Sequence, residues 1–180
     1  MNVNQTTFID TLLERFEFTE CSHIPASVSG NLGPVKEGDT VVDRPYRSAV
    51  GGLMWLAGVT GSGIANAARD LTRESHDPFE IHWRGVLKVL AYLNRTRHYD
   101  LTFSSGESVL SVYCDADYAK KETDRRSVAG VAVMYGGVAV LSTSRTQHWV
   151  TLSTTGAEYV TMTERVEECM FVGSCYIRQR

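Results

Sequence analysis

The chain has 180 residues, of which 43% are hydrophobic and 22% are charged, enough for one sizeable core or two small ones. Its formal net charge of −3 argues against a generally basic nucleic-acid-binding protein, although local basic patches can still contact phosphates. No apolar run approaches the roughly 20 residues of a membrane span, and the first residues lack a secretory signal. We therefore expect a globular protein without a membrane partner, in an intracellular compartment that is cytoplasmic or nuclear.

The first half of the chain has a helical period. Apolar residues predict an amphipathic helix over Thr6–Phe16, followed by a connector over residues 21–44 that is rich in Pro, Gly, Ser and charge. Pro45 suits a first helical turn and predicts a helix over residues 46–58. A second helix is expected over residues 64–72. Pro78 precedes the clearest helix of the chain, over residues 79–95.

The helix over residues 79–95 has two chemically different faces. At about 100° per residue, one face collects the apolar side chains of Trp83, Val86, Leu87, Leu90 and Leu93. The opposite face collects three cations, Arg84, Lys88 and Arg95. Two interpretations of the cations stay open, a solvated charged face opposite a core stripe, or a basic surface that follows a nucleic-acid backbone.

After Asp100 the period changes from helix to strand. Alternation predicts a strand over Val109–Cys114 that leads into Asp115-Ala116-Asp117. Two further strands are expected over residues 127–135 and 138–144. The Gly136-Gly137 pair between them is typical of a two-residue hairpin turn. Residues 148–152 either extend the last strand or follow it after a break.

A second long helix is expected at the end of the chain. Ser153 is placed to cap it, and helical spacing continues to about Tyr176. Tyr159, Met162, Val166, Cys169 and Met170 repeat at helical spacing along it. The chain's cysteines have no CxxC spacing and no paired histidines at zinc-ligand distance, so we expect ordinary reduced thiols.

Sequence blocks along most of the chain resemble one known family. They are PYRSAVGGLMWLAG (residues 45–58), HWRGVLKVLAYLNRTRHYDLTF (82–103), YCDADYA (113–119), DRRSVAG (124–130) and LSTTGAEYV (152–160). In this order and spacing they resemble the Pol polyprotein of copia-type retrotransposons, from the end of the reverse transcriptase region into the ribonuclease H domain. A cellular ribonuclease H would not carry the blocks between residues 45 and 103.

The resemblance implies an α+β fold with two domains. Residues 1–105 would form a helical connection region containing the loop 21–44. Residues 106–180 would form a partial ribonuclease H-like domain of strand, β-hairpin and helix, without its later strands. The implied activity is hydrolysis of RNA paired to DNA, so an RNA–DNA hybrid or another nucleic acid is the expected partner. The sequence does not indicate an oligomeric state.

The resemblance also implies a metal site. Asp115 matches the family's first-strand aspartate and Glu158 matches the glutamate in the first turns of the following helix, both as catalytic residues and metal ligands. Mg²⁺ or Mn²⁺ would be the cofactor, because hard cations prefer carboxylate oxygens and two ions need several carboxylates. The structural alternative is that Asp115 ends a strand, where acids are common, and that Glu158 complements a helix dipole.

Departures from the family pattern limit these expectations. The family's third and fourth acids have no counterpart among the 180 residues, so metal binding by the chain alone should be weak or absent. Gly156 stands where the family usually has glutamate, which would form a capping box with Ser153. Two hypotheses therefore remain, a ribonuclease H-type enzyme fragment that needs further acids, and a non-catalytic remnant or recruited binding module.

Overall fold

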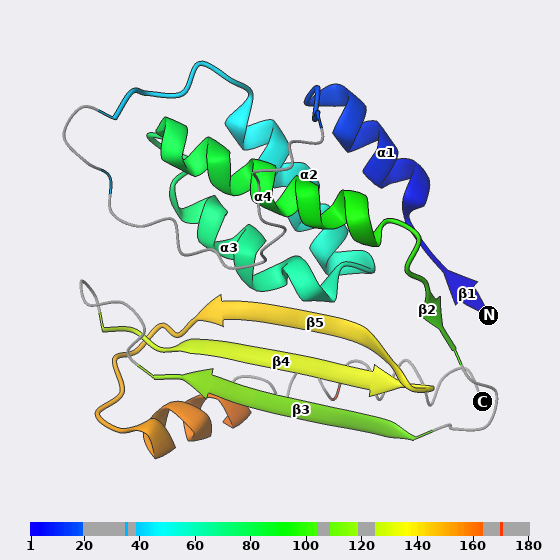
Figure 1. The fold of residues 1–180 in the computed structure, drawn as a ribbon. Coiled ribbons are helices and arrows are strands. Elements are labelled where there is room, and N and C mark those ends of the chain that lie inside the picture. Colours follow the sequence, from blue (N-terminus) through cyan, green and yellow to red (C-terminus); the bar gives the residue numbers. More distant parts are fainter. Residues whose placement is uncertain (20–34, 36–38, 104–108, 119–124, 164–169, 171–180) are drawn as a thin grey trace. The chain divides into compact units, whose positions relative to one another are not determined.

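The computed structural model describes residues 1–19, 35, 39–103, 109–118, 125–163 and 170 (Figure 1). The chain divides into a helical unit, Asn2–Leu101, and a sheet unit formed by Met1 and Thr102–Arg180. Helices and antiparallel strands both occur, which confirms the α+β class. In the part of the chain so described, no helix is both long enough and apolar enough to cross a membrane.

The helical unit is built from four α-helices and one 3-10 turn within its described residues. They are α1 (Thr6–Arg15), α2 (Tyr46–Val59), η1 (Ser62–Ile64), α3 (Ala65–Arg73) and α4 (Glu80–Thr96). Helix α4 packs against the other three α-helices, and α2 also packs against α3 (Figure 1). The observed ends of each α-helix lie within one residue of those expected from the sequence. Most of the connector over residues 21–44 lies outside the described residues.

The starts of α2 and α4 follow from local chemistry. Pro45 occupies the position before α2, where its fixed φ suits a helix start and its missing N–H costs nothing. At α4, the backbone N–H of Phe79 donates to Nδ1 of His82 at 3.0 Å. This hydrogen bond satisfies an N–H that has no carbonyl partner within the helix. The chain before α4 is also fixed, because Val42 N–H donates to the Pro78 carbonyl at 2.9 Å and Glu80 N–H to that of Thr40 at 3.0 Å.

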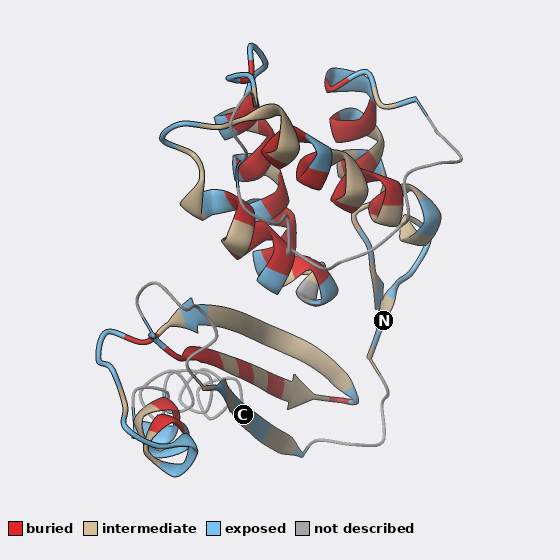
Figure 2. Cartoon of the chain, turned by 60° about the vertical axis from the view of Figure 1, so that its left-hand side comes forward, coloured by how far each residue is buried: buried red, intermediate tan, exposed pale blue. Residues whose placement is uncertain are grey.

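A large apolar core fills the helical unit. Figure 2 shows the buried residues gathered on the inner faces of its helices. The Tyr46 hydroxyl lies inside and donates to the Leu71 carbonyl at 2.8 Å, which links α2 to α3. Burial, and secondarily the charge of Glu74, raises the pKa of Tyr46 well above its ordinary value. The largest fully buried side chains of this unit are Tyr46, Leu53, Leu56, Ile64, Leu71, Val86 and Leu90.

The sheet unit contains a three-stranded antiparallel sheet in the order β3-β4-β5. Its strands are β3 (Leu110–Asp117), β4 (Val128–Tyr135) and β5 (Val138–Thr146). Gly136 and Gly137 have φ angles of 59° and 82°, which a two-residue hairpin turn requires and glycine adopts without strain. A separate two-stranded sheet pairs β1 (Asn2–Val3) with β2 (Leu101–Thr102). The φ angles of Gly136 and Gly137 and the antiparallel pairing of β4 with β5 confirm the hairpin expected from the sequence.

A helix follows β5, and its start agrees with the sequence. It covers residues 154–163 in the described part of the chain (orange in Figure 1). The Ser153 hydroxyl accepts a hydrogen bond from the Gly156 N–H at 3.0 Å, as expected of a cap. The expected continuation toward Tyr176 lies almost entirely outside the described residues.

Other details of the sheet unit bear on the expectations from the sequence. Strand β3 ends at Asp117, so the segment Asp115-Ala116-Asp117 forms its end, with Asp115 paired with Gly130 and Asp117 with Val128. Residues 148–152 do not extend β5, which leaves the alternative that they follow it after a break. On the following helix, Tyr159 and Met162 are 68% and 54% exposed, while Ala157 and Thr161 are fully buried. In these turns the inward face therefore carries small residues, while Val166 and Cys169 of the expected repeat lie outside the described residues.

Candidate nucleic-acid interface and carboxylate pair

The three cations predicted on α4 lie on its outer side. Its inner side is packed, with Trp83 and Leu90 2% and 1% exposed. Arg84 and Arg95 are exposed and Lys88 is partly exposed. Within the described residues, these three side chains make no hydrogen bond or ion pair. Their charge is therefore available to an external anion.

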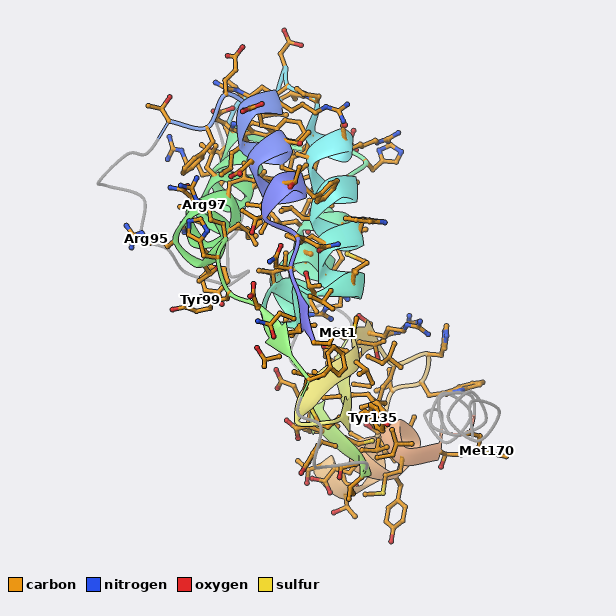
Figure 3. All side chains as sticks on the ribbon, turned by 90° about the vertical axis from the view of Figure 1, so that its right-hand side faces the viewer. Met1, Arg95, Arg97, Tyr99, Tyr135 and Met170 are labelled. Atoms are coloured by element: carbon orange, nitrogen blue, oxygen red, sulfur yellow. The ribbon has the colours of Figure 1, made fainter. Side chains whose placement is uncertain are left out.

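The arginines near the two ends of α4 behave differently. Arg97, one residue after the helix, pairs with Asp10 of α1 at 3.4 Å and donates to His98. The guanidinium of Arg44 lies over the Trp83 ring at 5.4 Å from its centroid. Arg95, by contrast, extends away from the helical bundle (Figure 3). The structure thus separates cations that hold the fold together from cations that face solvent.

Asp115 is the first of the two predicted carboxylates. It lies in β3, is exposed, and its Oδ1 accepts a hydrogen bond from the Ala116 N–H at 2.9 Å. Its neighbour across the β3–β4 pair is Gly130, where an added Cβ would meet only the Asp115 carbonyl, at 3.9 Å. The surface beside Asp115 is therefore shallow and open on the side of β4.

Glu158 is the second predicted carboxylate. It lies in the second turn of the helix over residues 154–163 and is exposed. The preceding residue, Ala157, is fully buried. The helix therefore packs through the face that carries Ala157, and the Glu158 side chain lies in solvent. The position near a helix N-terminus favours a negative charge through the helix dipole.

The strand register determines which residues share a face with Asp115. Directly paired residues of antiparallel strands point to the same side, so Asp115, Gly130 and Ser144 share one face. The most buried residues of β4, Ala129, Val131 and Val133, alternate with Gly130 and face the other way.

The helix that carries Glu158 is fixed through Gln147. The Gln147 N–H donates to the Ser127 carbonyl. Ser127 and Gln147 lie one position beyond the last β4–β5 pair, so strand alternation places their side chains on the same face of the sheet as Ala129. The register therefore gives no support for the expectation that Asp115 and Glu158 meet on one side. Among the described residues, no group of three or more His, Cys, Asp and Glu side chains could hold a metal ion. The shared metal site remains a prediction.

Sequence analysis assigned no role to two buried polar residues, Gln147 and Thr161. They are 1% and 0% exposed, and the Gln147 amide donates to Thr161 Oγ1 at 2.9 Å and to the Ala157 carbonyl at 2.7 Å. A weak signal was available, because Gln147 follows an alternating strand and precedes a helix cap. Polar residues at such a junction are usually exposed, so the pattern alone did not distinguish this one.

Sequence comparison places the chain among transposon proteins. It is 32% identical over 178 residues to the retrovirus-related Pol polyprotein from transposon TNT 1-94 of Nicotiana tabacum, covering 94% of this chain and 13% of that protein. It is 29% identical over 178 residues to the corresponding polyprotein from transposon RE1 of Arabidopsis thaliana, covering 97% of this chain and 12% of the relative. The chain thus spans a small part of these polyproteins.

A relative of a different kind is a short protein, shorter than this chain. Secreted RxLR effector protein 161 of Plasmopara viticola is 37% identical over 129 residues, which are 71% of this chain and 91% of that protein. No family model matches the chain, and no solved structure matches it.

Proposed function

Because the chain belongs to the Pol polyprotein family of copia-type retrotransposons, we propose that it is a nucleic-acid-binding segment joining the polymerase region to a ribonuclease H-like unit. In this proposal its helical unit contacts the backbone of an RNA–DNA hybrid. Its sheet unit contributes part of a ribonuclease H-like domain, whose parent activity is hydrolysis of the RNA strand.

The observation that carries the proposal is the outer face of α4. Arg84, Lys88 and Arg95 are exposed or partly exposed there, without a hydrogen-bond or ion-pair partner among the described residues. From the first to the last, the three extend roughly 16 Å along the helix at about 1.5 Å per residue. Each strand of a duplex places a phosphate about every 3.4 Å along its axis, so this face can follow several phosphates.

The carboxylates support hydrolysis only in combination with further groups. Asp115 and Glu158 are exposed oxygen donors of the type that Mg²⁺ prefers. Two-ion hydrolysis requires several convergent carboxylates, and the described residues hold no such group. The described residues therefore do not fit the complete metal site, and we propose that the chain binds a hybrid without cutting it. Further acids would have to come from outside the described residues.

A second candidate function is a binding module without turnover. It is favoured by the effector-named relative, because a similar region makes up 91% of that protein. A region retained at that length can serve as a recruited module without polymerase or nuclease chemistry. Both candidates are consistent with nucleic-acid binding, but only the first expects hydrolysis once the missing acids are present.

The proposal is tested by measuring affinity for a fluorescent RNA–DNA hybrid across a salt series. The variant carries Arg84→Gln, Lys88→Gln and Arg95→Gln. We expect weaker binding at every salt concentration and a slope of log affinity against log salt that is reduced by roughly two to three units, about one for each lost phosphate contact.

A matched control removes the same amount of charge elsewhere. It carries Arg15→Gln, Arg47→Gln and Arg125→Gln, on α1, on α2 and just before β4. The control should retain most of the wild-type affinity and slope. Equal losses in both triple variants would mean that net charge alone matters, and would contradict a binding face on α4.

A further inference from the structure

Gln147 is a buried polar residue at the junction between the sheet and the helix. It directly follows β5 and is 1% exposed. Its N–H donates to the Ser127 carbonyl at 2.9 Å, which extends the β4–β5 pairing by one position. A second contact joins Ser127 to the segment after Gln147, between the Ser127 and Thr151 hydroxyls at 3.3 Å. The backbone of Gln147 is therefore fixed by the sheet.

The side chain of Gln147 reaches from the sheet to the helix. Its amide nitrogen donates to the Ala157 carbonyl at 2.7 Å and to Thr161 Oγ1 at 2.9 Å. The Thr161 hydroxyl in turn donates to the Ala157 carbonyl at 3.0 Å, so each of the three groups is hydrogen-bonded to the other two. Ala157 and Thr161 are both fully buried and lie one helical turn apart on the same face.

This contact needs the chemistry of a primary amide. The amide nitrogen has two N–H groups, which match two acceptors on one helical face. A hydrocarbon of the same length would remove both hydrogen bonds that the Gln147 amide makes in this buried contact, which is costly. Ala157 allows the close approach, because a larger side chain there would push the helix away from the sheet.

The contact also determines where Glu158 is placed. Residues i and i+4 define a line along a helix, and the next residue is rotated about 100° from it. Once the line of Ala157 and Thr161 is fixed against Gln147, the direction of the Glu158 side chain is fixed as well. The Ser153 cap holds the start of the helix but does not determine its rotation against the sheet.

We propose that Gln147 is a positioning residue. It fixes the height and rotation of the helix over residues 154–163 on the sheet, and thereby the placement of the Glu158 carboxylate. Any role of that carboxylate in hydrolysis rests on the proposed function, whereas the Gln147 contact does not. Its side-chain Oε1 is buried and has no hydrogen-bond partner among the described residues, whereas its amide nitrogen has two.

The test compares Gln147→Met with Gln147→Glu in the full chain. Amide hydrogen exchange over residues 158–163 and the side-chain carboxyl ¹³C shift of Glu158 are the two readouts. In Gln147→Met we expect exchange to be at least about tenfold faster, because a buried hydrogen-bonded contact is lost. The Glu158 shift should move toward that of an unstructured glutamate.

Gln147→Glu adds a dependence on pH that simple packing would not produce. Burial raises the pKa of the introduced carboxyl above its ordinary value, and only its protonated form can donate to the Ala157 carbonyl. Protection against exchange, measured relative to the intrinsic amide rate at each pH, should therefore be largely restored at about pH 4 and lost as the pH rises toward 7. Gln147→Met should show no such recovery.

Two control variants separate the contact from general destabilisation. Thr163→Val removes an exposed hydroxyl whose hydrogen bond within the described residues goes to the Tyr159 carbonyl of the same helix, and should leave exchange unchanged. Val133→Ala weakens the sheet packing and should speed exchange at every pH alike. If Gln147→Glu behaves like Val133→Ala, or if Gln147→Met keeps wild-type exchange, the positioning role is wrong. Hybrid binding should persist in all of these variants, so loss of the proposed function would be seen separately.

Discussion

The two units bury different kinds of side chain. The helical unit encloses large apolar residues such as Leu53, Leu56 and Leu90, each at most 1% exposed. In the described part of the sheet unit, the buried apolar residues are valines and alanines, joined by Ser127, Gln147 and Thr161. Burying a leucine contributes roughly 1.5–3 kcal/mol, and smaller side chains contribute less. The helical unit is therefore held mainly by apolar packing, and the sheet unit depends more on particular hydrogen bonds.

The exposed side chains of the two units also differ. The outer face of α4 carries cations, whereas the sheet unit exposes large apolar side chains. Trp149, Leu152 and Tyr159 are 72%, 95% and 68% exposed. We expect the sheet unit to open at lower free energy than the helical unit, because it buries less apolar surface and leaves more of it in water.

The largest expected effect is in the helical core. Leu53→Ala should destabilise the helical unit by about 2–5 kcal/mol, because Leu53 is fully buried and its removal leaves a cavity. Val133→Ala, at a fully buried site in β4, should cost the sheet unit only about 1.5–2.5 kcal/mol. Residue-resolved hydrogen exchange in denaturant would measure each unit separately. If both variants destabilised both units equally, the two units would not be energetically distinct.

A smaller effect is expected at the link between α2 and α3. Tyr46→Phe removes the hydroxyl that donates to the Leu71 carbonyl and should cost about 1 kcal/mol at pH 7. Because burial raises the pKa of Tyr46, its neutral form is favoured by folding. The stability that depends on this group is complete below the unfolded pKa of about 10 and falls as the pH rises above it.

Urea denaturation at pH 7, 10 and 11 would measure this dependence. The wild-type chain should lose stability between pH 10 and 11, and Tyr46→Phe should lose less over the same interval. A variant that declines as steeply as wild type would show that other groups cause the alkaline loss.

The smallest expected effect is a gain in the sheet unit. Gly156→Glu should stabilise the helix by about 0.5–1 kcal/mol, through helix propensity and a carboxylate that can accept from the Ser153 N–H. An added Cβ would lie 3.2 Å from the Ser153 hydroxyl, which can adjust by rotation. Thermal melting would measure the gain, and Gly156→Ala would isolate the part due to propensity. A lower midpoint for both variants would mean that the Ser153 cap cannot adjust.

Sequence patterns predicted local structure better than tertiary contacts. Pro45, Pro78 and Ser153 correctly marked helix starts, and the Gly136-Gly137 pair marked the hairpin. Each acts locally, the prolines and glycines through their backbone geometry and Ser153 through a side-chain hydrogen bond three residues along the chain. The apolar stripe predicted on α4 was also confirmed, because an apolar repeat over a 17-residue helix leaves little ambiguity about which face is buried.

The remaining features depend on contacts between segments distant in sequence. The inward face of the helix over residues 154–163 is set by Gln147, which no periodicity reveals. Helical spacing grouped Tyr159 and Met162 without indicating which way they face, and the structure leaves both exposed. Likewise, the motifs containing Asp115 and Glu158 indicate a family, but whether two carboxylates meet is decided by strand register and helix placement.

The most direct test of the account is a gel experiment with one labelled RNA–DNA hybrid. The purified chain is incubated with the hybrid and millimolar Mg²⁺ or Mn²⁺, and the products are run on native and denaturing gels. We expect a slower band on the native gel, weakened by the Arg84, Lys88 and Arg95 substitutions, and intact RNA on the denaturing gel. RNA cleavage that disappears in an Asp115→Asn, Glu158→Gln double variant, or no slower band at all, would contradict a chain that binds without cutting.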